Sequence, residues 1–343
     1  MKKSLLALAV LTAVTGAASA QSSVTLYGKV DLGMVLDSGG ASGKSVRIAS
    51  GVTGGSRIGF KGVEDLGGGM KAAFQLETGY CADSAAGAPN FCTGSNQFMG
   101  RQAHGDLTGA FGAISAGRQY SLGFNNLSTI DPFGTGFAGQ SNNSSAAGVY
   151  MVDPSGIRLN NSVTYSTPNM GGFTVSAEAA LGEQTGNWQA NRETGAAVTF
   201  ASGPAYAGFS YYDVSNASGV GAAKKVYLLG GTYDLGVIKL HALAQKVTGP
   251  SSLDLFNMMG GVTVPIAGGN LLASYVHHND RTSGDKDANQ IGVGYLYPLS
   301  KRTSVYTAFA RIQNQHGAAF LVGNATEQGT GNKAFNFGVV HNF

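Results

Sequence analysis

Residues 157–166 read IRLNNSVTYS, a stretch in which apolar and polar side chains alternate. Successive side chains of a strand point to opposite faces, so a strand here would carry two rows. One row is Ile157, Leu159, Asn161, Val163 and Tyr165, and the other is Arg158, Asn160, Ser162, Thr164 and Ser166. In a soluble sheet the first row would pack into a core, whereas in a membrane barrel it would face lipid and Arg158 would point into water.

The same alternation recurs along the whole chain and predicts sixteen short strands. In residues 237–245, for example, Leu240 and Ala242 lie on one row while Lys239 and His241 lie on the other. Short turns rich in Gly, Pro, Asn and Asp connect some segments. Longer connections are expected near residues 38–53, 80–97, 119–156, 183–192, 214–224, 248–254, 279–288 and 313–332. Short turns at one end and long loops at the other are typical of an outer-membrane barrel.

The composition agrees with a membrane barrel. Only 12% of the 343 residues are charged, against roughly 25% in soluble domains. No stretch after residue 20 has about 18 uninterrupted apolar residues, so a transmembrane helix is not expected. An integral membrane protein without such a helix has to be a closed barrel, because lipid leaves no partner for free backbone groups.

The first 20 residues have the pattern of a secretory signal peptide. A basic start at Lys2 and Lys3 precedes an apolar run, and Ala18-Ser19-Ala20 fits the A-x-A cleavage motif. We expect cleavage after Ala20, which lowers the formal charge from +3 to +1. A charge this small gives no basic field for nucleic acid, so no nucleic-acid partner is expected.

The chain has two cysteines, Cys81 and Cys92, eleven positions apart in YCADSAAGAPNFC. Export, an even count and close spacing favour one disulfide that closes a short loop. Two lone cysteines lack the further ligands of a zinc site, and we expect no metal and no cofactor.

The final segment, KAFNFGVVHNF at residues 333–343, is strongly aromatic. Its outer row would be Phe335, Phe337, Val339, His341 and Phe343. Aromatic residues near strand ends form the interfacial girdles of membrane barrels. A soluble strand ending in the same way remains the alternative.

Taken together, these segments resemble the Gram-negative general porin family over nearly the whole mature chain. The resemblance is carried by SVTLYGKVDLGM (23–34), SRIGFKGVEDLGGGMKAAFQLE (56–77), GRQAHGDLTGAFGAISAGRQ (100–119), NNSVTYSTPNMGGF (160–173) and FNFGVVHNF (335–343). It implies an all-β, sixteen-stranded antiparallel up-and-down barrel at residues 21–343 and an aqueous channel for small hydrophilic solutes. It also implies a homotrimer, and a third loop, residues 119–156, that folds back into the lumen.

In the anion-preferring porins that this chain resembles, an arginine cluster on the barrel wall faces the third loop. The matching positions are Arg57, Arg101 and Arg158. The alternation supports a lumenal position for Arg57 and Arg158 and is less decisive for Arg101. Arginine suits the role because it stays charged and presents several donors in a fixed fork. The loop has only two acids, Asp131 and Asp153, so positive charge is expected to dominate the constriction.

Four further charged residues are weaker lumenal candidates, namely Lys61, Arg118, Glu178 and Lys239. Arg118 shares a row with Ile114 and Ala116, so a lumenal position would require a bulge or a role at a trimer contact. Glu178 would partly offset the positive cluster.

The expected function is passive diffusion through an outer-membrane channel with a modest anion preference, without catalytic residues. The expected partners are two further copies of the chain, outer-membrane lipid and lipopolysaccharide, small ions and solutes, and the barrel-assembly machinery, which would read the C-terminal strand ending at Phe343. Three alternatives remain open at this point: a substrate-specific porin, an outer-membrane barrel enzyme with a Ser, His and acid constellation, and a soluble secreted β-sandwich.

Overall fold

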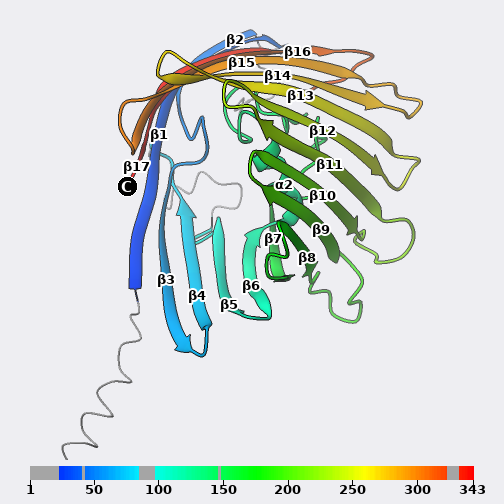
Figure 1. Cartoon of the computed structure of the whole chain (residues 1–343). Coiled ribbons are helices and arrows are strands. Elements are labelled where there is room, and N and C mark those ends of the chain that lie inside the picture. The colour runs from blue at the N-terminus through cyan, green and yellow to red at the C-terminus, as the bar shows by residue number, and fades with distance from the viewer. Residues whose placement is uncertain (1–22, 41–42, 85–96, 146–147, 323–331) are drawn as a thin grey trace, which may run out of the picture.

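The computed structural model describes residues 23–40, 43–84, 97–145, 148–322 and 332–343. Their strands form one antiparallel sheet that closes on itself (Figure 1). The first strand, β1 (Ser23–Gly40), pairs with the last, β17 (Lys333–Asn342), on one side. On its other side β1 pairs with β2 (Gly43–Ser50) and β3 (Arg57–Gly67). The sheet therefore has no open edge, as a membrane-spanning sheet requires.

The strands β2 and β3 are two halves of one barrel strand. β2 pairs with the later half of β1 and β3 with its earlier half, and residues 51–56 interrupt them. With the two counted as one, the 17-stranded sheet is a sixteen-stranded barrel, which confirms the predicted fold. The expected long connection at residues 38–53 is wrong, because residues 43–50 extend the sheet instead.

The remaining strands follow in chain order, each paired with its sequence neighbours. They are β4 (Met70–Gly79), β5 (Gln102–Gly109), β6 (Gly112–Tyr120), β7 (Arg158–Ser166), β8 (Phe173–Ala180), β9 (Glu193–Ser202), β10 (Ala205–Val214), β11 (Lys224–Asp234), β12 (Lys239–Thr248), β13 (Asp254–Ile266), β14 (Gly269–Asp280), β15 (Ala288–Pro298) and β16 (Thr303–Asn314).

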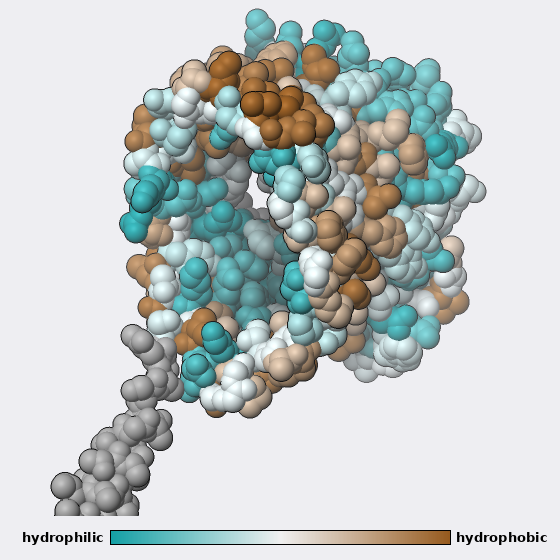
Figure 2. Space-filling model, viewed as in Figure 1, coloured by the Kyte–Doolittle hydropathy of each residue, from teal (hydrophilic) through white to brown (hydrophobic). Residues whose placement is uncertain are grey.

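The side chains of the barrel wall are sorted as the alternation predicts. In β12, Leu240 is 43% exposed on the outer row, whereas His241 and Gln245 on the inner row are 7% and 1% exposed. Figure 2 shows hydrophobic residues on the outer surface and mainly hydrophilic residues around the central hollow. The apolar rows therefore face outward and the polar rows inward, the reverse of a soluble sheet.

The alternation predicted for residues 157–166 holds in only half of that stretch. Val163 and Tyr165 are exposed on the outer row and Thr164 is buried on the inner row, as expected. Leu159, in contrast, is only 4% exposed and packs in a buried cluster with Tyr212, so its predicted outer position is wrong. The cause is an irregularity at Asn161, which has a φ of 50°, where the pairing of β6 with β7 also shifts register.

A long segment, residues 121–157, connects β6 to β7 and contains the helix α2 (Leu122–Ile130). Ser121 caps the helix, because its hydroxyl accepts a hydrogen bond of 3.0 Å from the backbone N–H of Phe124. In Figure 1 the helix lies on the concave side of the sheet near β9–β12, whose strands it contacts.

Inward-facing side chains of β12 and β15 form hydrogen bonds with segment 121–157. His241 on β12 donates from Nδ1 to the carbonyl of Ile130 over 2.7 Å. Gln290 on β15 donates to the carbonyl of Gly139 over 3.1 Å. Buried polar groups need such partners, and the segment supplies them through its backbone. The polar inner rows therefore attach the segment as well as line the hollow.

The C-terminal residue is paired with the first strand. The backbone N–H of Phe343 donates to the carbonyl of Gly28 over 3.1 Å, and the N–H of Gly28 donates back over 3.0 Å. Phe335, Phe337 and Val339 are 41–44% exposed on the outer row, as predicted.

The signal peptide predicted at residues 1–20 lies outside the described residues, so the boundary at Ala20 stays a prediction. Among the residues that are described, no helix is both long enough and apolar enough to span a bilayer.

Replacing Leu229 by Arg tests the outward assignment of the apolar rows. Leu229 is 59% exposed in the middle of β11, so Arg there would contact hydrocarbon and destabilise the barrel by about 2–4 kcal/mol. The matched control is Thr232→Arg on the inner row of the same strand, beside a cavity of about 400 Å³. Unfolding in detergent or lipid measures both variants, and an equal loss of stability would contradict the assignment.

Candidate functional site

Basic side chains from several strands line one cavity of about 920 Å³ on the inner wall. The charged side chains of the cavity lining are Lys29, Arg57, Glu77, Arg101 and Arg158. The structure thus brings together the three arginines named from the sequence, and it adds one lysine and one glutamate. Segment 121–157 contributes neutral lining residues, among them Asn125, Ser128 and Gln140.

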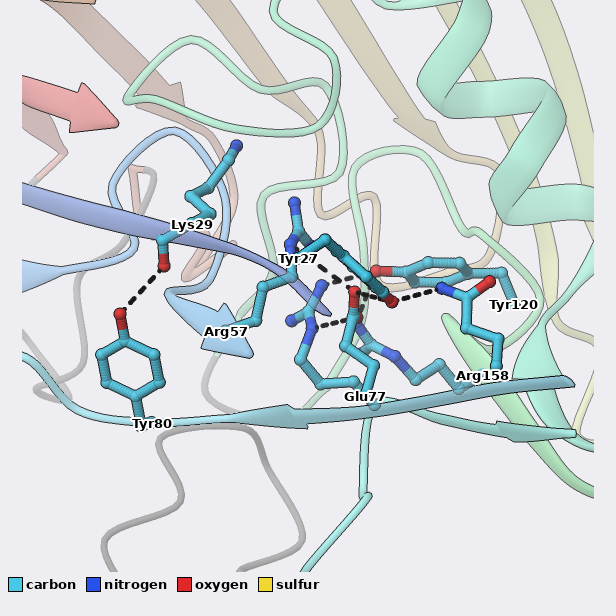
Figure 3. Close-up of polar contacts among 9 residues, drawn as sticks. Tyr27, Lys29, Arg57, Glu77, Tyr80, Tyr120 and Arg158 are labelled. Carbon is cyan, nitrogen blue, oxygen red and sulfur yellow. Dashed lines mark hydrogen bonds and ion pairs between the residues drawn. The ribbon is translucent and has the colours of Figure 1, made fainter. Parts of the chain in front are cut away.

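Glu77 on β4 lies at the centre of the basic cluster (Figure 3). Its carboxylate accepts a hydrogen bond of 2.7 Å from Nε of Arg101 and lies 3.7 Å from Nε of Arg57. The hydroxyl of Tyr27 donates to the same carboxylate over 3.0 Å. The Glu77 and Arg101 side chains are 4% and 5% exposed, whereas Arg57 is 23% exposed. Glu77 therefore positions two arginines and cancels one of the four positive charges.

Tyr120 at the end of β6 connects Arg101 to the third arginine, Arg158. Its hydroxyl oxygen accepts hydrogen bonds from Arg101 over 2.6 Å and from Arg158 over 2.8 Å. The guanidinium of Arg158 also lies over the Tyr120 ring, 4.5 Å from its centroid. The phenolic oxygen accepts from two cations, so its own hydrogen is available to another acceptor in the cavity.

Lys29 and Glu77 were not identified from the sequence. Both lie on inner rows, which alternation alone reveals. Lys29 is on the same row of β1 as Tyr27, and Glu77 is on the same row of β4 as Gln75. Alternation gives the face of a residue and not its neighbours across the barrel. In Figure 3 the ammonium group of Lys29 points away from Tyr80, whose hydroxyl donates to the Lys29 carbonyl over 3.1 Å.

The two acids of segment 121–157 lie outside the cavity lining. Asp131 is buried and accepts hydrogen bonds from the backbone N–H and hydroxyl of Ser141, each over 2.7 Å, and from Phe133. Burial raises the pKa of Asp131, and these hydrogen bonds oppose the rise. Asp153 pairs with Lys224 at 2.9 Å. Neither carboxylate is directed at the arginines.

The weaker candidates occupy different places. Glu178 is 4% exposed on the inner row of β8, where Tyr212 and Thr164 donate to it. Lys239 lines the inner cavity near β10–β12, and the ammonium of Lys61 lies 5.4 Å from the centroid of the Tyr27 ring. Arg118 donates to the carbonyl of Gly100 over 2.7 Å and to Asn160 over 2.5 Å. None of these four side chains lines the arginine cavity.

A serine, a histidine and an aspartate also meet on the inner wall, but not in the geometry of a hydrolase. Ser115 and Asp106 both contact the same nitrogen, Nδ1 of His104, at 3.3 and 3.0 Å. In a catalytic triad the carboxylate binds Nδ1 while the hydroxyl binds Nε2. This cluster therefore gives no support to the enzyme alternative.

Cys92 lies outside the described residues, so the disulfide between Cys81 and Cys92 stays a prediction. Within the described ranges, no group of three or more His, Cys, Asp or Glu side chains is arranged to hold a metal ion.

Comparison with known proteins gives matches over almost the whole chain. The family model described as "Gram-negative porin" matches residues 7–317. An outer membrane porin protein 32 of Delftia acidovorans is 36% identical, covering 92% of this chain and 90% of that protein. An outer membrane porin protein of Bordetella pertussis is 32% identical over 92% of this chain and 95% of its own length.

Solved structures agree with these sequence matches. The anion-selective porin from Comamonas acidovorans superposes with a TM-score of 0.79 at 29% identity, covering 94% of this chain and all of that one. OmpF of Salmonella typhi superposes with a TM-score of 0.69 at 19% identity, which supports the fold alone.

Proposed function

The chain belongs to the Gram-negative porin family, and from this premise we propose that its channel prefers anions because of Arg57, Arg101 and Arg158. Porins are channels of the outer membrane rather than enzymes, and this protein is a channel for passive diffusion. Anion selectivity is stated for the similar porin from Comamonas acidovorans, and the proposal extends this property to the present chain.

The excess of positive charge on the cavity wall carries the proposal. Four basic side chains and one acidic side chain line the cavity, and the lining residues of segment 121–157 are neutral. An anion that loses part of its hydration shell there finds guanidinium donors and the Tyr120 hydroxyl as replacements. Among the described side chains of the lining, Glu77 is the one carboxylate that a cation meets, and it already accepts from Arg101 and Tyr27.

Segment 121–157 is proposed to act as the inward-folded third loop and to narrow the lumen opposite the arginines. Its attachment through Ile130 and Gly139 to inner-row side chains supports this role. A narrow passage keeps the permeating ion close to the charged wall, where electrostatic screening by water is weaker.

The assembly and partners of the chain are also proposals. By resemblance to its family we propose a homotrimer, contact with outer-membrane lipid and lipopolysaccharide, and recognition of the strand ending at Phe343 by the assembly machinery. The pairing of Phe343 with Gly28 supports a role for this residue in closing the barrel.

Reconstitution of the mature protein in a planar bilayer under a KCl gradient tests the anion preference. We expect a zero-current potential on the chloride side, larger at 0.1 M than at 1 M salt, because the Debye length falls from about 10 to about 3 Å. A potential on the potassium side would contradict the proposal. Saturation of the current by one solute would instead favour a substrate-specific porin.

A further inference from the structure

A second cavity, of about 300 Å³, adjoins the arginine cavity on the inner wall of β4–β7. Three residues, Gln102, Tyr120 and Asn125, line both cavities, so the two are neighbouring parts of one lumenal surface. A volume of this size is at the lower end of the range for small-molecule sites. Together the two cavities can hold a solute that has two chemically different ends.

The strand register places the second cavity on the short-turn side of the arginines. Glu77 of β4 is paired with Gln102 of β5, and one inner position further along these strands Gln75 is paired with His104. Asp106 is the next inner position of β5, which runs toward the short turn that joins it to β6. Two residues along a strand span about 7 Å. A hexose phosphate has a similar reach from its phosphate to its ring hydroxyls, so it can contact both cavities at once.

The second cavity is lined mainly by groups that both donate and accept hydrogen bonds. Amide side chains come from all of β4, β5, β6 and helix α2, and hydroxyls come from Ser115, Thr164 and Ser166. Its described lining contains no lysine and no arginine. A simple anion requires donors alone, whereas every hydroxyl of a sugar donates as well as accepts. The lining therefore suits a polyhydroxylated group better than a second anionic group.

His104 and Asp106 strengthen this distinction between the two cavities. Nδ1 of His104 lies 3.0 Å from the carboxylate of Asp106 and 3.3 Å from the hydroxyl of Ser115. If the Nδ1 proton is donated to Asp106, Nε2 of the neutral imidazole is an acceptor for a solute hydroxyl. The Asp106 carboxylate is 22% exposed, and its negative charge repels anions while its oxygens accept from hydroxyls.

We propose that the two cavities form one site for phosphorylated sugars, with the phosphate on the arginines and the sugar hydroxyls on the second cavity. The inference rests on the proposed anion preference and extends it to a class of solute. Guanidinium groups match phosphate in a bidentate geometry. Tyr120 lies at the boundary, where its hydroxyl accepts from Arg101 and Arg158 and its ring stacks on Phe124 at 4.9 Å. Binding at this site is weak, because a channel has to release its solute as readily as it admits it.

Block of the KCl current through the mature protein in a planar bilayer tests the site. Glucose 6-phosphate, inorganic phosphate, glucose and phosphoethanolamine are added separately at about pH 8, where histidine is mostly neutral. The apparent dissociation constant of glucose 6-phosphate is expected to be about tenfold lower than that of inorganic phosphate, the factor that two net hydrogen bonds supply. Glucose and phosphoethanolamine are expected to bind more weakly than glucose 6-phosphate, because each lacks one of the two chemical ends.

The double variant His104→Leu, Ser115→Ala removes polar groups from the second cavity without changing the net charge. Its affinity for glucose 6-phosphate is expected to fall to about that of inorganic phosphate, while phosphate affinity, open-channel conductance and zero-current potential stay at the wild-type values. Unchanged conductance verifies folding. His104→Gln alone keeps a donor and an acceptor and should retain most of the preference for the sugar phosphate.

The matched control is Ser202→Ala, Thr232→Val, which removes two hydroxyls from the separate cavity of about 400 Å³ near β10–β12 and should behave as the wild type. Three results would refute the sugar-phosphate site: equal block by glucose 6-phosphate and inorganic phosphate, tighter binding of phosphoethanolamine, or equal losses in the two double variants. Any of them, found with a zero-current potential on the chloride side, leaves the anion preference intact. A potential on the potassium side contradicts the anion preference itself.

Discussion

Replacing Arg57, Arg101 and Arg158 together by Gln is expected to abolish the anion preference and move the zero-current potential toward the potassium side. One unit charge 4 Å from an ion contributes about 1 kcal/mol in water and about 4 kcal/mol near a protein surface. The lower figure for a single charge already corresponds to about fivefold, so we expect the loss of three charges to lower the anion-to-cation permeability ratio by at least about tenfold. Lys29 remains beside Glu77 in the variant, so the wall becomes nearly neutral.

The measurement is the zero-current potential of the triple variant in a planar bilayer under the same KCl gradient as the wild type. Arg118→Gln is the matched control, since Arg118 is basic and yet does not line the cavity. If the triple variant shifts the potential no further than Arg118→Gln does, the arginine cluster does not set selectivity.

The single variants should separate selectivity from stability. Arg57 is 23% exposed and only 3.7 Å from Glu77, so its removal should change the potential at little cost to folding. Arg101 is 5% exposed and hydrogen-bonded to Glu77, so its removal leaves a buried carboxylate without its closest partner.

Replacing Glu77 by Gln is expected to increase the anion preference and to destabilise the barrel. The substitution removes the negative charge of the cavity lining and leaves Arg101 buried without a counter-ion. Breaking a buried ion pair in this way costs about 3–5 kcal/mol, although the remaining amide oxygen of Gln still accepts a hydrogen bond and should keep the loss near the lower value. The zero-current potential and the unfolding midpoint in detergent measure the two effects.

Glu178→Gln is the control for Glu77→Gln. Glu178 is equally buried, at 4% exposed, but its partners are neutral donors, namely Tyr212, Thr164 and the backbone N–H of Leu122, and it does not line the arginine cavity. This variant should affect stability without changing the potential. An unchanged potential in the Glu77 variant would show that permeating ions do not sense that carboxylate.

The three arginines are positioned around one cavity by Tyr120 and Glu77, two residues that belong to no recognisable sequence motif. Tyr120 accepts from two of them and Glu77 contacts two of them, with Arg101 common to both sets. A polar network of this kind restricts flexible side chains to a few conformations, which gives the permeating ion a fixed charge pattern. Variants of Tyr120 or Glu77 therefore act on selectivity through arginine positions as well as through charge.

The sequence by itself determined the all-β class, the sixteen barrel strands and the division of their side chains between two faces. These properties are local, because a period of two residues assigns each side chain to one face or the other without reference to distant strands. Local reasoning failed where the period is interrupted, as at Asn161, where a positive φ turns Leu159 inward. It also missed β2, since residues 43–50 are recognised as a strand only through their pairing with β1.

Only the tertiary structure decided which inward-facing groups meet. Lys29, Arg57, Glu77 and Arg158 come from four different strands, and barrel closure and register determine their separation. The same holds on the outer surface, where cross-strand pairing places Lys246 between Tyr227 and Phe256. A side chain's face is fixed by its own strand, but its neighbours depend on how the strands are paired, and alternation within one strand carries no information about that pairing.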